Sequence, residues 1–322
     1  MNLVINTIID DLSEVLDIEQ KELLRATLFK RLKQYDTNYS EYSNTDYIEM
    51  FIAAKSVEGC SSRTLTYYKS TIEKVFSEIT IPIGKVTTDI LREYIATYQG
   101  RSKCGKVTID NIRRIMSSFF SWLENEDFII KSPVRRIHKI RKGSVVKETF
   151  SDENIELMRD NCKELRDLAI LDLLYSTGIR VGELVNLDVS DINFEERECI
   201  VFGKGDKERK VYFDARTKIH LKEYIKTRDD NNPALFVTLQ KPYNRLKISG
   251  VEIRVRELGR RLHIDKVHPH KFRRSMATRA IDKGMPIEQV QKLLGHSQID
   301  TTMQYAMVNQ NNVKNSHRRY IG

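Results

Sequence analysis

The part of the chain that most restricts its fold is its last fifth, where helical apolar spacing coincides with several ionisable side chains. His270 and Arg273 are three residues apart, and residues at this spacing lie on one face of a helix. Gly284 separates that helix from a second apolar-periodic run that ends near His296, and Tyr305 follows nine residues later. The stretch therefore predicts two consecutive helices whose imidazoles, guanidinium and phenol can act on one target.

An imidazole, a fixed cation and a phenol together suggest chemistry at a phosphate, with tyrosine as the nucleophile. Cleavage of a phosphodiester by a protein nucleophile requires in-line attack, stabilisation of charge on the phosphoryl oxygens and protonation of the leaving 5′-oxygen. Arginine can supply the stabilisation in place of a metal, because its guanidinium fork matches two phosphate oxygens at once. The sequence shows no acidic metal cluster and offers two more cations, Arg180 in STGIRVGEL and Lys204 in GKGDKER.

Taken together, these motifs resemble the tyrosine recombinase family, which includes phage integrases and Xer recombinases. The resemblance extends over roughly residues 47–306, and its motifs are specific as a set. It implies six catalytic residues: Arg180, Lys204, His270, Arg273, His296 and Tyr305. It also implies that each cut makes a 3′-phosphotyrosyl bond, that strands are exchanged through a Holliday junction, and that no metal, cofactor or ATP is used.

The resemblance assigns a role to each group at the phosphate. Arg180 and Arg273 would hold the scissile phosphate. Glu183, three residues after Arg180, would orient the Arg180 side chain. His270 would accept the proton of Tyr305, because a free phenol with a pKa near 10 needs a base and a positive field to lose it. The site is therefore expected to carry its own base.

Lys204 and His296 complete the set of roles, and Lys204, His270 and Tyr305 each have a rival nearby in the sequence. Lys204 would protonate the leaving 5′-oxygen from the turn of a β-hairpin, where Lys207 is the alternative. His296 would donate a hydrogen bond to the phosphate. His268 is a weaker rival for the general base, and Tyr320 is the other C-terminal tyrosine, but both lie outside the family motif.

Hydrophobic periodicity predicts a mainly α-helical chain with a small antiparallel β-sheet, and the resemblance implies that its two domains form a DNA clamp. Residues 41–130 resemble the family's helical, SAM-like core-binding domain, and residues 149–322 its catalytic domain with a C-terminal tail. Residues 131–148 are predicted to form a basic linker between them. Residues 1–40 are predicted to form an acidic helical extension, preceding a polar connection at residues 36–46.

Apolar spacing and capping residues place the individual elements. In the first domain, four helices are expected near Asp46, from Ser61 or Ser62, from Thr87 or Thr88, and over residues 109–123. In the second domain, the expected elements are a helix after Ser151, two helices broken at residues 176–178, a hairpin over 198–214, a helix over 217–227, a short strand at 235–238 and a helix over 248–264.

The charge distribution predicts a nucleic-acid partner for most of the chain. The net charge is +9, although residues 1–50 contain five basic and ten acidic residues. Residues 131–147 contain seven basic residues and no acidic one, as expected for a strap that neutralises phosphates. Plausible further DNA contacts, outside the catalytic set, are Arg63, Lys69, Lys106, Arg113, Arg114, Lys207, Arg209 and Arg274.

Composition points to an intracellular, water-soluble protein. No apolar run reaches the roughly 20 residues that a membrane span needs, and the first residues lack the charged start and apolar core of a secretory signal. The four cysteines are scattered without metal-ligand spacing and resemble reduced thiols. We therefore expect a cytoplasmic bacterial protein that associates with the nucleoid when it is bound to DNA.

The sequence restricts the biological role of the protein less than it restricts the reaction. The resemblance implies a homotetramer on two double-stranded inverted-repeat core sites, with a possible accessory protein. The acidic helical extension argues against the basic, β-rich arm-binding module of many phage integrases, and plain Xer proteins usually lack such an extension. We favour an integrase, excisionase or invertase of a mobile element; the alternatives are an Xer-type dimer resolvase, a type IB topoisomerase and a catalytically silent DNA-binding protein.

Overall fold

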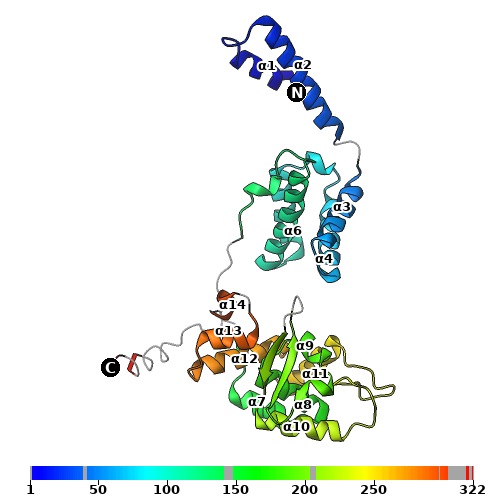
Figure 1. The fold of residues 1–322 in the computed structure, drawn as a ribbon, viewed down its shortest axis with the longest axis vertical. Helices are drawn as coiled ribbons and strands as arrows, with labels where there is room; N and C mark the ends of the chain where they lie inside the picture. The colour runs from blue at the N-terminus through cyan, green and yellow to red at the C-terminus, as the bar shows by residue number, and fades with distance from the viewer. Residues whose placement is uncertain are drawn as a thin grey trace. The chain divides into compact units, whose positions relative to one another are not determined.

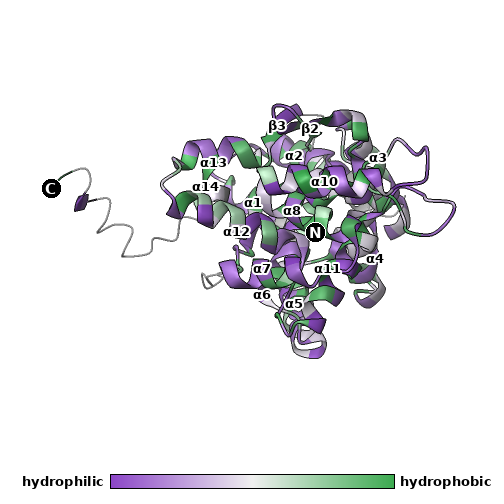
Figure 2. Cartoon of the chain, turned by 90° about the horizontal axis from the view of Figure 1, so that it is seen from below, coloured by the Kyte–Doolittle hydropathy of each residue, from purple (hydrophilic) through white to green (hydrophobic). Residues whose placement is uncertain are grey.

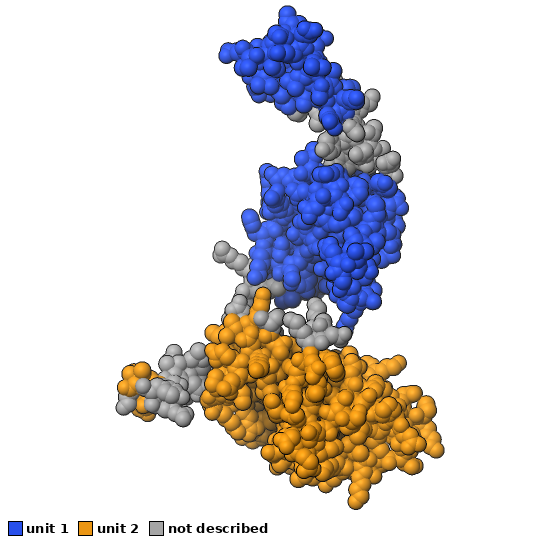
Figure 3. All heavy atoms as spheres, viewed as in Figure 1, with its two compact units in different colours: residues 1–144 blue, residues 145–322 orange. Residues whose placement is uncertain are grey.

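The structure is a computed structural model in which the chain forms two compact units, residues 1–144 and 145–322 (Figures 1 and 3). It describes residues 2–38, 42–140, 148–203, 208–296, 298–303, 317–318 and 321. The units are mostly helical, and the described residues contain one small antiparallel sheet, in the second unit. The predicted fold class is therefore confirmed. Many helices carry both hydrophilic and hydrophobic residues, as amphipathic packing requires (Figure 2).

The chain begins with a helical hairpin of α1 (Asn2–Asp11) and α2 (Ile18–Asn38). Asp17 caps α2, since its Oδ1 accepts the backbone N–H of Gln20 at 2.8 Å. The contact between the two helices buries Ile5 and Ile9. Leu23 on α2 is nevertheless 70% exposed, so the hairpin covers only part of the predicted apolar stripes.

Four helices then form the predicted bundle: α3 (Asn44–Val57), α4 (Ser62–Glu78), α5 (Thr88–Ser102) and α6 (Lys106–Asn125). Helix α3 begins two residues earlier than expected, because Asp46 is the third residue of a capping box and Ser43 is the cap. Ser61 and Thr87 cap the next two helices as predicted. Trp122 lies in the bundle core with Phe119 and Phe120.

The first residues of the predicted linker belong to the bundle. Short 3₁₀ turns lie at η1 (Ile83–Lys85) and η2 (Pro133–Arg136), and Val134 in η2 is buried in the bundle core. The Thr88 hydroxyl donates to the Pro133 carbonyl at 2.7 Å. The part of the linker that packs on no helix therefore begins later than residue 131, and residues 141–147 lie outside the described residues.

The second unit is built around α8, a helix buried on nearly all sides. Its helices are α7 (Asp152–Asp160), α8 (Leu165–Thr177), α9 (Val181–Asn186), α10 (Ala215–Lys226), α11 (Ile248–Arg261), α12 (Pro269–Asp282), α13 (Ile287–Leu294) and α14 (Ile299–Met303). Helices α10, α11 and α12 all contact α8. A helix that is apolar all round is stable only when it is surrounded in this way.

A small antiparallel sheet lies beside these helices. Its order is β1 (Ile192–Asn193), β2 (Glu198–Phe202) and β3 (Glu208–Tyr212), and β1 follows the 3₁₀ turn η3 (Val189–Asp191). The two-residue β1 was not predicted. The short strand expected at residues 235–238 is not formed, and single bridges at Ala234 and Val237 take its place. Arg245 holds this loop by donating to the Val185 and Leu187 carbonyls.

Candidate active site

The break between α8 and α9 positions Arg180. Helix α8 ends at Gly178, whose φ of +62° lies in the left-handed region that favours glycine. A Cβ there would lie 2.2 Å from Met276 Cε and 3.3 Å from Leu294 Cδ2. The close packing at this turn therefore also requires a residue without a side chain. Gly178 thus lets the chain pass tightly against α12 and α13 before it reaches Arg180.

Arg180 is oriented by Glu183, as the sequence suggested. Its Nη1 donates to Glu183 Oε1 at 2.8 Å, and its backbone N–H donates to Oε2 at 2.8 Å. Burial favours the neutral acid, but hydrogen bonds from Arg209 and Arg180 outweigh it and lower the pKa of Glu183. The carboxylate is therefore charged, while the Arg180 side chain stays 35% exposed and open to a ligand.

Helix α12 carries His270 and Arg273 as predicted. Arg273 is 3% exposed, and it donates from Nη1 to the Gly178 carbonyl at 2.6 Å and from Nη2 to the Leu294 carbonyl at 2.5 Å. The pKa of His270 is lowered by burial and by the charges of Arg273 and Arg180. A neutral imidazole beside two arginines can accept a proton, which suits the role of general base.

His296 is held between α12 and α14. Its Nε2 lies 3.0 Å from Arg273 Nη2, and its Nδ1 lies 2.8 Å from the hydroxyl of the buried Thr302. Because arginine can only donate, Nε2 is the acceptor, which places the ring proton on Nδ1. Burial and the charges of Arg273, Arg180 and Arg209 lower the pKa of His296 to about 4. The donation of a hydrogen bond from His296 to a phosphate stays a prediction. It requires one ring nitrogen to exchange its protein partner for the phosphate.

The C-terminal end of α13 gathers the arginines. Three consecutive backbone carbonyls accept from three different guanidiniums: Leu293 from Arg209 at 3.1 Å, Leu294 from Arg273 at 2.5 Å, and Gly295 from Arg180 at 3.3 Å. The last carbonyls of a helix lack intrahelical partners and carry partial negative charge. They can therefore hold several cations close together before any phosphate binds.

The structure brings four of the six predicted catalytic residues together: Arg180, His270, Arg273 and His296. Lys204 and its rival Lys207 lie outside the described residues, between β2 and β3. Tyr305, two residues after the end of α14, and Tyr320 also lie outside them. The roles of these four residues therefore stay predictions. The His268 ring centroid is 6.5 Å from that of His270, and burial is the main cause that lowers its pKa too.

The other predicted DNA contacts differ in their surroundings. Lys69 pairs with Glu49 at 2.5 Å, and Arg113 pairs with the buried Asp110 at 3.1 Å. Arg274 Nε donates to the Glu148 carbonyl at 2.9 Å, at the start of the second unit. Exposed on the bundle are Arg63, Lys106 and Arg114. Each of these contacts stays a prediction.

Arg209 makes contacts inside the protein that the sequence did not predict. Its Nη1 and Nη2 donate to Glu183 at 2.6 and 2.7 Å, and its Nε donates to Leu293. All three nitrogens serve protein acceptors, so the expected phosphate contact by Arg209 gains no support. The available signal was strand alternation, which puts position 209 on the core face with the flanking Val211 pointing the same way.

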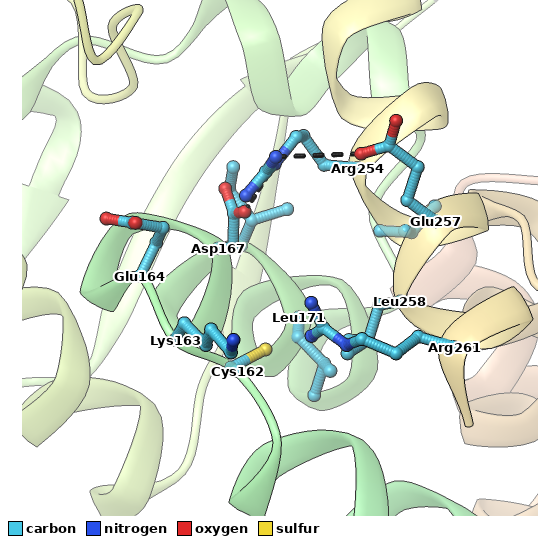
Figure 4. Close-up of a pocket in the computed structure, with 11 residues that line it drawn as sticks. Cys162, Lys163, Glu164, Asp167, Leu171, Arg254, Glu257, Leu258 and Arg261 are labelled. Carbon is cyan, nitrogen blue, oxygen red and sulfur yellow. Dashed lines mark hydrogen bonds and ion pairs between the residues drawn. The ribbon is translucent and has the colours of Figure 1, made fainter.

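A separate hollow of about 100 Å³ lies between the start of α8 and α11 (Figure 4). Arg254, one of its cations, pairs with Asp167 at 2.7 Å and Glu257 at 3.6 Å. Burial raises the pKa of the Cys162 thiol to about 12, so this cysteine is protonated and is no nucleophile. None of the four predicted catalytic residues that the structure describes lines this hollow.

Two other kinds of site are absent from the residues that the structure describes. Within these ranges, no cluster of three or more histidine, cysteine, aspartate or glutamate side chains could hold a metal ion. In the same part of the chain, no helix is long and apolar enough to cross a membrane.

Comparison with known proteins identifies the class that this fold and site define. The phage integrase family matches residues 148–312, and the N-terminal SAM-like domain of phage integrases matches residues 47–130. The chain belongs to the phage integrase family of tyrosine recombinases, and it is a site-specific recombinase that cleaves and rejoins DNA through a tyrosine intermediate.

Individual relatives agree over most of the chain. The tyrosine recombinase XerA of Pyrococcus horikoshii is 32% identical over 275 residues, which cover 83% of this chain and 91% of XerA. The tyrosine recombinase XerC of Thermodesulfovibrio yellowstonii is 31% identical over 276 residues, covering 81% and 91%. The Tn1549 transposon integrase shares the fold, with a TM-score of 0.68 and 18% identity. The match covers 85% of this chain and 98% of the integrase structure.

Proposed function

We propose that Tyr305 is the nucleophile and that the cluster at the end of α13 binds the scissile phosphate. The observation that carries this proposal is the convergence of Arg180, Arg209 and Arg273 on three carbonyls of one helix end, with His270 in the field of Arg273 and Arg180. Preorganised cations of this kind stabilise the negative charge that develops at a phosphate during reaction. A fixed arginine pair stabilises that charge without reorganising at the moment of attack.

The proposed reaction conserves the energy of the bond that it breaks. The Tyr305 oxygen attacks phosphorus in line, its proton passes to His270, and the bond from phosphorus to the 5′-oxygen breaks. Lys204 gives its proton to the leaving 5′-oxygen, which leaves as a free hydroxyl. The product is a 3′-phosphotyrosine, which the 5′-hydroxyl of a partner strand attacks in the reverse sense. Since the phosphotyrosine stores the bond energy, ATP is not consumed.

The proposed substrate is double-stranded DNA with inverted-repeat core sites, bound by a homotetramer, possibly with an accessory protein. Support comes from structures that share the fold: the Tn1549 integrase is in complex with a circular intermediate DNA, and XerH is bound to a palindromic difH substrate. The basic residues 131–147 supply the positive charge that such a complex needs. We place this activity in the bacterial cytoplasm, at the nucleoid.

Two biological roles compete. The acidic hairpin α1–α2 supports a recombinase of a mobile element, which integrates, excises or inverts DNA. The XerA and XerC relatives, matched over 91% of their lengths, support an Xer-type resolvase of chromosome or plasmid dimers. We favour the mobile element. Inverted repeats beside the gene, tested as substrates, separate the two: a site next to the gene itself supports the mobile element, and a distant chromosomal site supports dimer resolution.

A nicked suicide substrate tests the proposed nucleophile. On such DNA the cut strand loses its 5′-hydroxyl end, so the covalent protein–DNA adduct accumulates and is visible on a denaturing gel. The wild-type enzyme should form the adduct, and Tyr305→Phe should bind the same DNA with unchanged affinity and form none. Tyr320→Phe is the matched control and should react like the wild type. An adduct that persists in Tyr305→Phe and disappears in Tyr320→Phe would move the nucleophile to Tyr320.

A further inference from the structure

Arg209 occupies a position at which a hairpin ordinarily places an apolar side chain. It lies opposite Val201 in the β2–β3 register, and Val211 lies opposite Cys199. These three neighbours are buried, and the Arg209 side chain is only 12% exposed. Burying a guanidinium among apolar side chains is costly unless the charge is paired. The arginine must therefore contribute something that a valine at this position would not.

Its partner is the carboxylate that also orients Arg180. Arg209 grips both oxygens of Glu183, at 2.6 and 2.7 Å, and Arg180 adds two hydrogen bonds at 2.8 Å from its side chain and backbone. One negative charge is thus shared by two positive charges, and the group of three keeps a net positive charge. Because Arg209 occupies much of the hydrogen-bonding capacity of Glu183, the charge of Arg180 is not fully neutralised by that carboxylate.

The same side chain reaches the end of α13. Its Nε donates to the Leu293 carbonyl, and a Cβ on Gly295 would lie 2.9 Å from Arg209 Cδ. Gly295, with φ +64°, therefore serves both the helix cap and the passage of the arginine. Arg209 thus connects β3 to the helix end that holds Arg180 and Arg273.

We propose that Arg209 is a positioning residue for strand cleavage, which saturates Glu183 and so keeps the charge of Arg180 available to the scissile phosphate. This inference rests on the proposed function, in which Arg180 binds that phosphate. Without Arg209, Glu183 has Arg180 as its remaining arginine partner and draws that guanidinium into a two-point ion pair. The phosphate then meets a neutralised arginine, and cleavage slows although the DNA is still bound.

The first variant is Arg209→Met, which removes the charge and keeps a long side chain. Cleavage of the suicide substrate should slow about 10- to 100-fold, the usual effect of losing a group that orients a functional side chain. Lys210→Met is the matched control: it removes a charge at the next position of the same strand, where Lys210 is exposed and pairs with Glu198 at 2.8 Å. The control should cleave at the wild-type rate.

The deciding variant adds Glu183→Gln to Arg209→Met. A neutral amide no longer captures Arg180, so the double variant should cleave about tenfold faster than Arg209→Met alone, roughly 1.4 kcal/mol in the barrier. A residue that only fills space would show no such recovery, and a double variant no faster than the single one overturns the inference. Should Arg209→Met not fold, Arg209→Lys takes its place. It must cleave more slowly than the wild type at equal DNA affinity, because lysine cannot bind both oxygens, and a wild-type rate contradicts the inference.

A substrate with a 5′-bridging sulfur separates Arg209 from the leaving-group acid. Its leaving group needs no proton, so the defect of Arg209→Met should be equally large on the oxygen and sulfur substrates. Recovery on the sulfur substrate would place the action of Arg209 on the leaving group and refute the present inference. The two levels of proposal fail differently: a wild-type enzyme without any adduct refutes the proposed function, whereas an Arg209→Met variant that cleaves like the wild type refutes this inference alone.

Discussion

At the scale of single residues, Lys204 offers the clearest chemical test. If it protonates the 5′-oxygen, Lys204→Ala should slow cleavage of ordinary DNA by about 100- to 10,000-fold, the range typical of a lost general acid. The 5′-bridging sulfur substrate should restore much of that rate, because a thiolate leaves without a proton. Lys207→Ala serves as the control, three residues further along the sequence. Equal defects of Lys204→Ala on both substrates would assign it to positioning.

The pH dependence of cleavage follows from His270. Burial, then Arg273 and Arg180, lower the pKa of His270 from its ordinary value of 6.5. A general base works in its neutral form, and a lowered pKa keeps it neutral below pH 6.5. The single-turnover rate should therefore be flat from about pH 8 to 6.5 and fall only in more acidic buffer. A rate that already falls between about pH 8 and 7 would contradict the assignment, and His268→Gln should leave the profile unchanged.

Sequence motifs predicted four residues that the structure brings together, but the sequence did not predict the contacts of Arg209, which depend on packing alone. Arg180 and Glu183 stand three residues apart, so their contact is local and visible in the sequence. The contact of Arg209 with Glu183 spans 26 positions and depends on β3 folding against α9. A run of charged residues on a hairpin suggests solvent, and only the inward direction of position 209 shows otherwise.

At the scale of elements, the same division holds. Helices with capping residues and regular apolar spacing begin where they were predicted to begin, as α4, α5 and α7 show. The two-residue β1 carries too little pattern to be recognised, because its place depends on the register of β2. Residues 235–238 have the composition of a strand but lack a partner strand. Single bridges and Arg245 hold them, and no local signal in the sequence indicates that.

The hairpin α1–α2 makes a prediction at this scale. It is acidic, so it gains nothing from approaching phosphates, yet exposed apolar residues remain on it. We expect it to pack on protein, either on its own core-binding domain or on a neighbouring protomer. Removing residues 1–40 should change the salt slope of single-site binding by less than about 0.9, the change that one phosphate contact produces. Pairing of two sites should weaken if the partner is another protomer.

Point variants sharpen this test. Leu23→Gln, at a position 70% exposed, should reproduce the loss of site pairing, whereas Thr27→Gln, also exposed on α2, should not. If removal of residues 1–40 only lowers the melting temperature of the monomer, the hairpin acts within its own chain. A clear drop in the salt slope would show that it touches DNA after all.

At the scale of the whole molecule, residues 308–322 make the last prediction. They follow the proposed nucleophile, are basic, and contain few apolar residues. In sequence they resemble the family tail that docks on a neighbouring protomer and controls which tyrosine is active. Truncation after Val308 should leave binding to a single site unchanged and reduce cooperative assembly, measured by gel shift on one-site and two-site DNA. Tetramers that form as readily without the tail would refute this role.

The packing of helix α13 also determines when the proposed phosphate site can form. Eight residues do not make a stable helix in water, and α13 forms because Val290 and Leu294 pack in a small cluster with α12. The carbonyls at its end face the arginines only when this packing is complete, so local fraying removes one carbonyl partner from each of the three guanidiniums. A chain in which α13 has not yet packed on α12 is therefore expected to lack part of the proposed phosphate site.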